Sequence, residues 1–528
     1  MIKSLGLMAL FLCVFGAQAQ YQFHLLNQSV EHRLGAQGAY GLEIDKHTAI
    51  RPLVDDKQYS PNSENNNTFK NWLKRKIFEE HLVDLQTDDF QLTVDPLVNL
   101  QLGDANDANG LQWVNTRGFH IEGRIGKDFS FYTSFRESQA DFPAYIRSFV
   151  GYRTVVPGQG RARVFGDQGF DYSLAMGEVS YAPGRHFTFS AGQGKNFFGE
   201  GYRSMILSDV STPYPFFRIQ TKVWNIKYVN LWAQLYDVRP QVSQGNIFPK
   251  KYLSTHYLSY NITPRLNVSF YESIVMGDTA QQRGLDPAFF NPVIFYRPVE
   301  FAVGSGVGNA LMGVGSSFKI KDGLMVYGQF TLDEFSFEDL IAGDGDWKNK
   351  YAGQLGVKAY NLLNVRGLFT RLEWNGARPY TYSHREPLTN YGHYGQGLAH
   401  PWGANFNEWV LQLAYQYKRW EFDFQLNTGQ IGLDENGSNW GTDIYLSYNT
   451  RQRDKENRVA QGNSAQLFYT HLRVAFIVNP ASGLKLETGV RYRSLRADNY
   501  SEKPFETGES TYVYGGLRTT FFNRYYDF

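Results

Sequence analysis

The chain has 528 residues, and its 52 basic and 51 acidic side chains leave a formal net charge of +1. This balance argues against a nucleic-acid partner, because nucleic-acid binding usually requires a strongly basic surface. Aromatic residues make up 16% of the chain, with 35 Tyr and 40 Phe. The surplus suits the two aromatic girdles of a membrane β-barrel, although a secreted all-β protein rich in aromatics would share it.

Residues 1–19 predict a cleaved export signal. Lys3 gives a short basic region, residues 5–16 are apolar, and Ala17-Gln18-Ala19 has the small-x-small pattern of a cleavage site. Cleavage there removes Cys13, the only cysteine, so no disulfide or thiol chemistry is expected. Cys13 would instead mark a lipoprotein if a small residue preceded it, but Leu12 does. No later run of 18 apolar residues offers a membrane helix.

Residues 20–88 predict a separate N-terminal segment, placed in the periplasm or as a plug. Within it, residues 68–84 predict an amphipathic helix, because Phe69, Trp72 and Ile77 recur at near-helical spacing among polar neighbours. One interpretation places this aromatic stripe against lipid or barrel at the periplasmic mouth. The alternative is a helix packed on other N-terminal residues.

From Phe90 onward the dominant period is two, which predicts β-strands with one apolar and one polar face. Residues 90–101, 420–427 and 484–493 show the alternation clearly. A soluble sandwich would also alternate, so strand length and loop asymmetry decide between the two. The segments run about 9 to 12 residues, the length of a tilted membrane strand. We therefore predict an all-β fold, a transmembrane antiparallel barrel over residues 89–528.

Tight polar turns alternate with long connections, which is typical of bacterial outer-membrane barrels. Counting from Phe90 gives about 18 strands, with 16 as the alternative, provided that residues 441–448 belong to a loop. An even number is required when both termini lie on one side. The tight turns are expected at 126–128, 183–185, 263–265, 321–323, 361–364, 418–419 and 480–483, and the long connections near 139–170, 196–216, 277–308, 376–407 and 431–463.

The chain ends in Tyr525-Tyr526-Asp527-Phe528, after an alternating run that starts at Tyr512. A terminal Phe with an aromatic residue two positions earlier is the usual assembly signal of outer-membrane barrels. The ending therefore predicts that the last residues belong to the closing strand, and the chain is expected in the cell outer membrane, in contact with its lipid.

Several motifs point to a known group. Residues 194–204 read GKNFFGEGYRS, 207–209 read LSD, 213–218 read PYPFFR, 398–406 read LAHPWGANF before Glu408, and 523–528 read NRYYDF. In these residues the chain resembles the Wzi-type capsule-assembly barrels and, more closely, the RemB-like gliding-motility barrels of Bacteroidota. The resemblance covers the chain from about Phe90 to the end.

The resemblance implies a non-enzymatic barrel for surface polysaccharide (capsule) assembly or attachment, or for gliding motility and adhesion. Its expected partners are surface polysaccharide and motility or secretion-machinery proteins. Aromatic faces that stack on sugar rings and cations that bind carboxylates or hydroxyls are the candidate glycan contacts. The alternative is that these loops fold inward and pack a plug. The candidates are Tyr202, Arg203, Arg218, Tyr380, Tyr382, His384, Arg385, Tyr391, His393, Tyr394 and Trp402.

Two other function classes stay open, a transport channel and, less favoured, a barrel-embedded hydrolase. Ser383, His384 and Glu386 superficially suggest a catalytic triad, but no nucleophile elbow or oxyanion sequence accompanies them. Residues 103–110 contain possible Ca²⁺ ligands, yet Ala108 at the fifth position breaks the EF-hand spacing, and turn formation is the commoner role. We therefore expect no catalytic residue, cofactor or metal.

Overall fold

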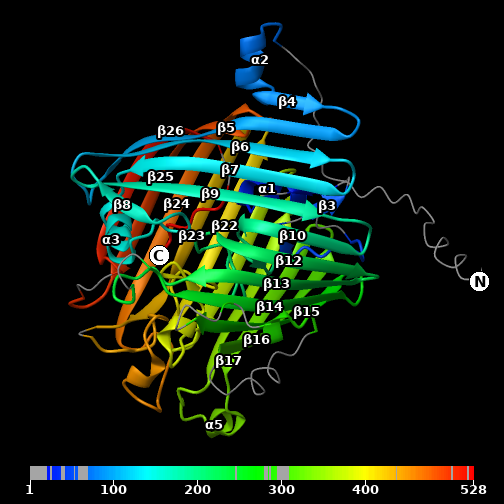
Figure 1. The fold of residues 1–528 in the computed structure, drawn as a ribbon. Coiled ribbons are helices and arrows are strands. Elements are labelled where there is room, and N and C mark those ends of the chain that lie inside the picture. The colour runs from blue at the N-terminus through cyan, green and yellow to red at the C-terminus, as the bar shows by residue number, and fades with distance from the viewer. Residues whose placement is uncertain are drawn as a thin grey trace, which may run out of the picture.

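The computed structural model describes residues 21–23, 26–36, 42–52, 54–56, 69–243, 247–278, 284, 287–293, 308–435, 437–500, 504–519 and 522–528. The predicted export signal lies outside these residues. Eighteen antiparallel strands form a closed barrel, in which the last strand pairs with the first (Figure 1). The fold class and the count of 18 are confirmed.

The barrel strands follow one another around the ring in chain order. They are β5 (Phe90–Ala105), β6 (Leu111–Ile125), β7 (Phe129–Ala140), β9 (Gly169–Tyr181), β10 (Phe187–Gly194), β12 (Tyr214–Val223), β13 (Ile226–Tyr236), β14 (Lys250–Asn261), β15 (Leu266–Asp278), β16 (Gly308–Lys321), β17 (Leu324–Glu334), β18 (Lys350–Tyr360), β19 (Leu368–Ala377), β22 (Phe406–Tyr417), β23 (Trp420–Leu433), β24 (Asn463–Asn479), β25 (Leu484–Arg496) and β26 (Gly508–Thr519).

Shorter elements lie outside the ring. β4 (Val83–Gln86) pairs with the start of β5, and β8 (Ala162–Phe165) pairs with the start of β9. The others are β1 (Tyr21–Phe23) with β3 (Val54–Asp56), β2 (Ile50–Arg51) with β11 (Phe197–Phe198), β20 (Gly392–His393) with β21 (Gln396–Gly397), helices α1 (Gln28–Ala36), α2 (Trp72–Phe78), α3 (Ala144–Arg153) and α5 (Phe337–Ala342), and the 3-10 turns Pro287–Phe290, Leu362–Asn364, Pro387–Thr389 and Tyr448–Thr450.

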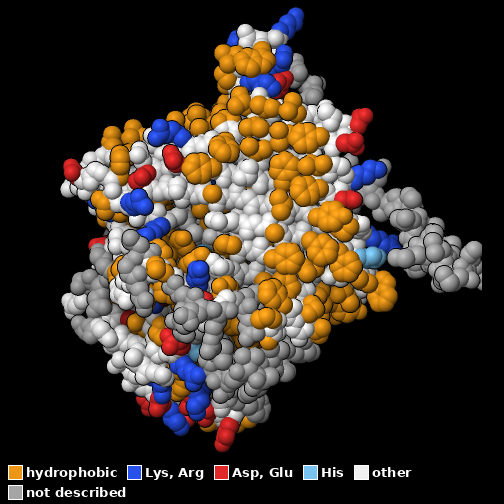
Figure 2. Space-filling model, viewed as in Figure 1, with side chains coloured by type: hydrophobic (Ala, Val, Ile, Leu, Met, Phe, Trp, Pro, Cys, Tyr) orange, Lys and Arg blue, Asp and Glu red, His pale blue; other side chains and the backbone are white. Residues whose placement is uncertain are grey.

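The two faces of each strand differ as the alternation predicts. In β25, Leu486 and Val490 are exposed on the outer wall, whereas Lys485, Glu487 and Arg493 are buried inside. Figure 2 shows the consequence, a broad apolar surface over the outside of the strands. In an outer-membrane barrel this apolar band faces the hydrocarbon of the bilayer. Among the described residues, no helix has the length and apolarity needed to cross a membrane.

One end of the barrel carries short turns and the other carries long loops. At the short end, Gly126 (φ 60°) and Gly483 (φ 68°) occupy left-handed positions that other residues adopt at a cost. Residues 441–448 belong to the long loop between Leu433 and Asn463, as the strand count requires. Because short turns face the periplasm in bacterial barrels, we assign the long-loop end to the cell exterior.

The predicted helix over residues 68–84 was too long. α2 covers only Trp72–Phe78: the Asn71 side chain caps its first turn by accepting from the N–H groups of Leu73 and Lys74. Soon after the helix, His81 contacts the Asp95 carboxylate at 2.5 Å, and the chain then runs along β5 as β4. Strand pairing with β5 therefore overrides the helical periodicity of the sequence.

The prediction that the last residues belong to the closing strand was wrong. β26 ends at Thr519, and the tail 522–528 turns back into the lumen, where Asp527 and Phe528 are buried. The Phe528 ring packs 4.7 Å from that of Phe149 in α3, between ring centres, at the long-loop end. Figure 1 shows the C-terminus beside α3. The polar groups of the tail find partners inside the barrel, such as Arg203 for Asp527.

Candidate functional site

The lumen is filled by chain from both ends and by loops that fold inward. Near the periplasmic end, Leu34 of α1 packs in a cluster with wall residues such as Tyr360 and Phe369. Higher in the barrel, β2 pairs with β11, which belongs to the loop after β10. The tail 522–528 and the loop from 378 to 405 occupy the region below the long-loop end. These segments together form what we call the plug.

A buried ion network joins the plug to the wall. The Arg203 guanidinium lies 2.8 Å from Glu408 and 2.9 Å from Asp527, and none of the three side chains is more than 1% exposed. Asp527 also accepts from the Tyr202 hydroxyl at 2.7 Å, and the Trp402 indole N–H donates to the Asp527 carbonyl at 3.0 Å. Asp527 therefore anchors the tail with both its side chain and its main-chain carbonyl.

A second ion network fixes the N-terminal segment. The Glu31 carboxylate of α1 lies 2.7 Å from the Arg51 guanidinium and 3.1 Å from the guanidinium of Arg371 on the wall. Lys358, also on the wall, pairs with Glu200 at 2.7 Å. Each buried charge thus faces an opposite charge, which is the condition under which ions are tolerated away from water.

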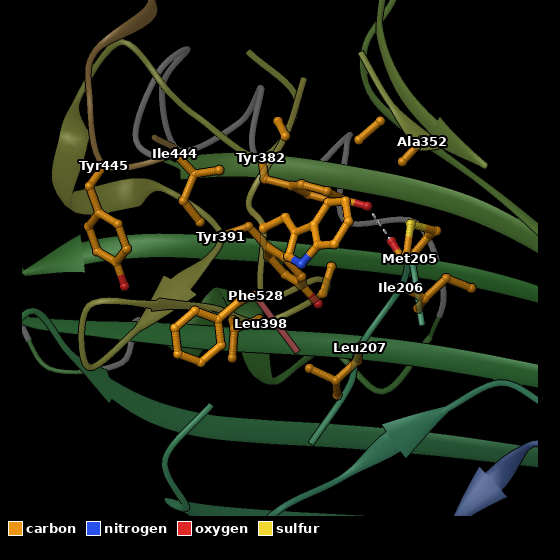
Figure 3. Close-up of a cluster of buried hydrophobic side chains, with 14 of the residues drawn as sticks. Met205, Ile206, Leu207, Ala352, Tyr382, Tyr391, Leu398, Ile444, Tyr445 and Phe528 are labelled. Atoms are coloured by element: carbon orange, nitrogen blue, oxygen red, sulfur yellow. Dashed lines mark hydrogen bonds between the residues drawn. The ribbon is translucent and has the colours of Figure 1, made fainter. Parts of the chain in front are cut away.

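An aromatic cluster occupies the lumen beneath the extracellular mouth. The Tyr382 and Tyr391 rings stack with centres 5.9 Å apart, and the Tyr382 hydroxyl donates to the Met205 carbonyl at 2.7 Å (Figure 3). Tyr391 shares a 2.5 Å hydrogen bond with the Tyr271 hydroxyl of the wall. Figure 3 shows Phe528 near the same cluster. These tyrosines pack the plug with both their rings and their hydroxyls.

A cavity of about 250 Å³ lies above this cluster, at the long-loop end. Its walls come from α3, from the loop around 395–403, from Asp434 and residues 437–446, from Tyr500, Pro504 and Phe505, and from the tail. Arg153 lines it and pairs with Asp443 at 3.2 Å. The volume lies just below the roughly 300–1,000 Å³ of small-molecule sites. Its aromatic lining residues are Phe149, Tyr152, Trp402, Tyr445, Tyr500, Phe505, Tyr525 and Phe528. We call it the mouth cavity.

Most of the predicted glycan-binding residues belong to the plug. Arg385 is exposed and Tyr394 is half-buried. Arg218 lies apart from the others, paired with Glu178 at 2.5 Å. Trp402 alone among the predicted residues lines the mouth cavity. Their glycan contact stays a prediction, and the inward-folded alternative describes their packing. The nine that are buried are Tyr202, Arg203, Arg218, Tyr380, Tyr382, His384, Tyr391, His393 and Trp402.

The suggested triad residues point to other partners. The Ser383 hydroxyl donates to the Tyr380 carbonyl at 2.6 Å, and the His384 ring shares a hydrogen bond with the Thr389 hydroxyl at 2.5 Å. A serine nucleophile needs its hydroxyl in hydrogen-bond contact with the base. This arrangement gives no support to the hydrolase alternative.

Histidines of the inward loop are held neutral. Burial lowers the pKa of His393 to about 3, and nearby Lys251 acts in the same direction. Burial likewise lowers the pKa of His400 to about 4. The His400 Nδ1 accepts from the backbone N–H of Trp402. Its Nε2 therefore carries the proton, which it donates to Glu408 at 2.8 Å. Neutral imidazoles therefore serve as fixed hydrogen-bond partners within the plug.

Sequence reasoning missed most of the mouth cavity. Tyr152 and Arg153 lie at the end of α3, in a long connection outside the strands. Phe505 comes from a loop that carries no motif. The available signal was the frequency of aromatic residues in every extracellular connection. That signal does not separate a ring that lines a cavity from one that packs a plug.

No protein-family model and no curated protein sequence matches the chain. Among solved structures it is similar to Escherichia coli Wzi, described as an outer membrane protein involved in group 1 capsule assembly and a carbohydrate-binding β-barrel. The TM-score is 0.55, with 14% identity over 96% of this chain and 100% of Wzi. Pseudomonas aeruginosa OprD has a TM-score of 0.42 and 11% identity, covering 82% and 96% of the two chains. Acinetobacter baumannii OccAB2 has a TM-score of 0.44 and 9% identity, covering 80% and 97%. The protein is thus an outer-membrane β-barrel that shares its fold with Wzi.

Proposed function

We propose that this barrel binds surface polysaccharide at its extracellular mouth and acts in the assembly or attachment of a capsule. The observation that carries the proposal is the mouth cavity, a partly aromatic hollow placed at the long-loop end of a filled barrel. Aromatic faces bind sugar rings by stacking, and Arg153 and Asp443 beside them offer a donor and an acceptor for sugar hydroxyls. The fold shared with Wzi, itself a carbohydrate-binding barrel, supports the same proposal.

The filled lumen favours binding over passage. Arg203, Glu408 and Asp527 connect the tail to the wall across the interior, and the aromatic cluster occupies the space above them. A channel would need these contacts to separate.

Gliding or adhesion differs from capsule attachment in the cellular partner, so a deletion strain scored for capsule retention and for spreading on agar distinguishes the biological roles.

The direct test uses purified protein titrated with the cell's own surface polysaccharide. The double variant Tyr152→Ala/Phe505→Ala removes two rings that line the mouth cavity, of which Tyr152 is 39% exposed. Each stacking contact contributes about 1 kcal/mol, so we expect affinity to fall about tenfold or more. Phe165→Ala, which truncates an exposed ring of β8 outside the cavity, is the matched control.

Heat-modifiable migration on gels confirms that each variant is folded. Equal affinity in the double variant and the wild type would exclude the mouth cavity as the binding site. Steady conductance of the wild-type protein in planar bilayers, without polysaccharide binding, would favour the channel alternative.

A further inference from the structure

A second cavity, of about 140 Å³, lies inside the barrel between the tail, α1 and the wall strands β22 to β26. Asp423, Arg473 and Arg518 line it from the short-turn halves of their strands, which places it toward the periplasmic side. It is therefore separate from the mouth cavity, and the proposed polysaccharide site does not account for it. We call it the lumen cavity.

The lumen cavity is rich in arginine. Four arginines line it against two aspartates, and both aspartates are already engaged. Asp423 pairs with Arg473 at 2.6 Å. Asp527 pairs at 2.9 Å with Arg203, which does not line the cavity. Glu487, behind the lining, is shared between Arg473 at 3.2 Å and Arg518 at 3.5 Å.

Two of the four arginines have no carboxylate of their own. Among the described residues, neither Arg491 nor Arg524 forms an ion pair. Arg491 is 8% exposed, and its Nε has no hydrogen-bond partner, as is also true of the Arg518 Nε. The guanidinium carbon of Arg491 lies 4.8, 5.7 and 5.8 Å from the ring centres of Tyr526, Tyr512 and Tyr514. These rings offset part of its buried charge but do not supply a carboxylate.

A guanidinium cannot relieve this situation by losing its proton, because its pKa is too high. Away from bulk water, a cation without a paired carboxylate is costly next to other cations. This cost applies to the buried Arg491, whereas Arg524 is half-buried at the edge of the cavity. An anion placed among them offsets that cost and satisfies the open N–H groups. Roughly 10–15 Å³ suffices for one water, so the cavity has room for an oxyanion with some of its hydration.

We propose that the lumen cavity is a binding site for a small soluble oxyanion, a carboxylate or a phosphate, held by Arg491 and Arg524. The planar fork of arginine matches the paired oxygens of both groups. Arg491 belongs to the wall and Arg524 to the tail, so the bound anion would connect these two parts of the molecule.

Purified protein is titrated calorimetrically with inorganic phosphate and with glucuronate at constant ionic strength. Glucose serves as the neutral control and chloride as the control for bulk charge. We expect saturable binding of one or both oxyanions, and a loss of at least tenfold in affinity in Arg491→Gln and in Arg524→Gln. Preference for phosphate or for glucuronate identifies which oxyanion chemistry the cavity takes. Arg496→Gln is the matched control, because that arginine of β25 is 73% exposed and pairs with Glu509 outside the cavity.

Arg524 lies beyond the last strand, so its replacement keeps the test valid if Arg491→Gln fails to assemble. Absence of saturable binding to the wild type overturns the proposal, as does unchanged affinity in the folded Arg524→Gln variant. Either result leaves the polysaccharide proposal intact, because the mouth cavity does not include these arginines.

Discussion

At the residue scale, many charged side chains inside this barrel are buried next to side chains of opposite charge. Arg203 is shared by Glu408 and Asp527, and each acid also accepts from neutral donors such as Asn427. Pairs of this kind contribute little net stability compared with apolar packing, but removal of one partner is strongly unfavourable. Such networks therefore specify where the tail lies more than they stabilise the barrel.

Arg203→Ala should release the tail. The substitution leaves Glu408 and Asp527 without their cation, and breaking a buried pair costs about 3–5 kcal/mol. We expect hydrogen exchange in residues 522–528 to accelerate by at least a hundredfold, while the wall strands keep their protection. Arg385→Ala, at an exposed position, should leave exchange of the tail unchanged. Equal tail protection in both variants would show that the tail is fixed by other contacts.

Acidification should loosen the inward loop. The folded protein holds His393 neutral with a pKa of about 3, whereas a released histidine has its ordinary value of 6.5. The contribution of this group to stability is therefore complete above about pH 6.5 and is lost as the pH falls toward 3. Limited proteolysis of residues 378–405 should be faster at pH 5 than at pH 7.5. His393→Asn, which retains an acceptor for the Tyr236 N–H, should reduce that pH dependence; an unreduced dependence assigns it to other groups.

At the element scale, the closing strand and the C-terminus are different parts of the molecule. β26 pairs with β5 from Tyr512 to Arg518, and the Thr519 side chain continues the contact with Val98. The final residues contribute to the plug instead. Barrel closure and lumen filling therefore have separate determinants in a short stretch of sequence.

Deletion of residues 522–528 should leave the barrel closed and weaken the plug. All of β26 remains, so we expect heat-modifiable, membrane-embedded protein. Loss of Asp527 and Phe528 removes one of the two acidic partners of Arg203 and a ring from the mouth cavity, and conductance in planar bilayers should rise. Alanine replacement of Phe165 controls for surface changes at the extracellular end. If the truncated protein fails to assemble, the ending acts as an assembly signal despite its position inside the barrel.

Strands were predictable from the sequence because their signal is local. Leu486 and Glu487 have to face opposite sides whatever the rest of the chain does. The end of β26 was not predictable, since aromatic residues recur in the sequence up to Phe528 and only distant partners such as Arg203 draw the tail inward. Likewise, the candidate aromatics Tyr382 and Tyr391 were found, but their burial depends on Met205 and Tyr271, far away in the chain.

At the scale of the whole molecule, the two ends of the barrel are chemically distinct. The long-loop end holds the mouth cavity with its aromatic lining, and the opposite end holds α1 and the short turns. The lumen cavity lies between them, nearer the short turns. A ligand arriving from outside therefore meets the mouth cavity first, and the plug separates it from the arginines below. This order fits a receptor for extracellular polymer better than an open conduit.

The proposed function depends on the orientation of the barrel, which epitope insertion tests. A Cβ added at Gly437, in the long loop between β23 and β24, meets no atom within 4 Å, so the position has room for an insert. The same holds for Gly483 in the short turn before β25. An epitope at Gly437 should bind antibody on intact cells, and one at Gly483 should do so only after permeabilisation. The reverse pattern would turn the mouth cavity toward the periplasm, where extracellular polysaccharide does not reach it, and the binding proposal would fail with it.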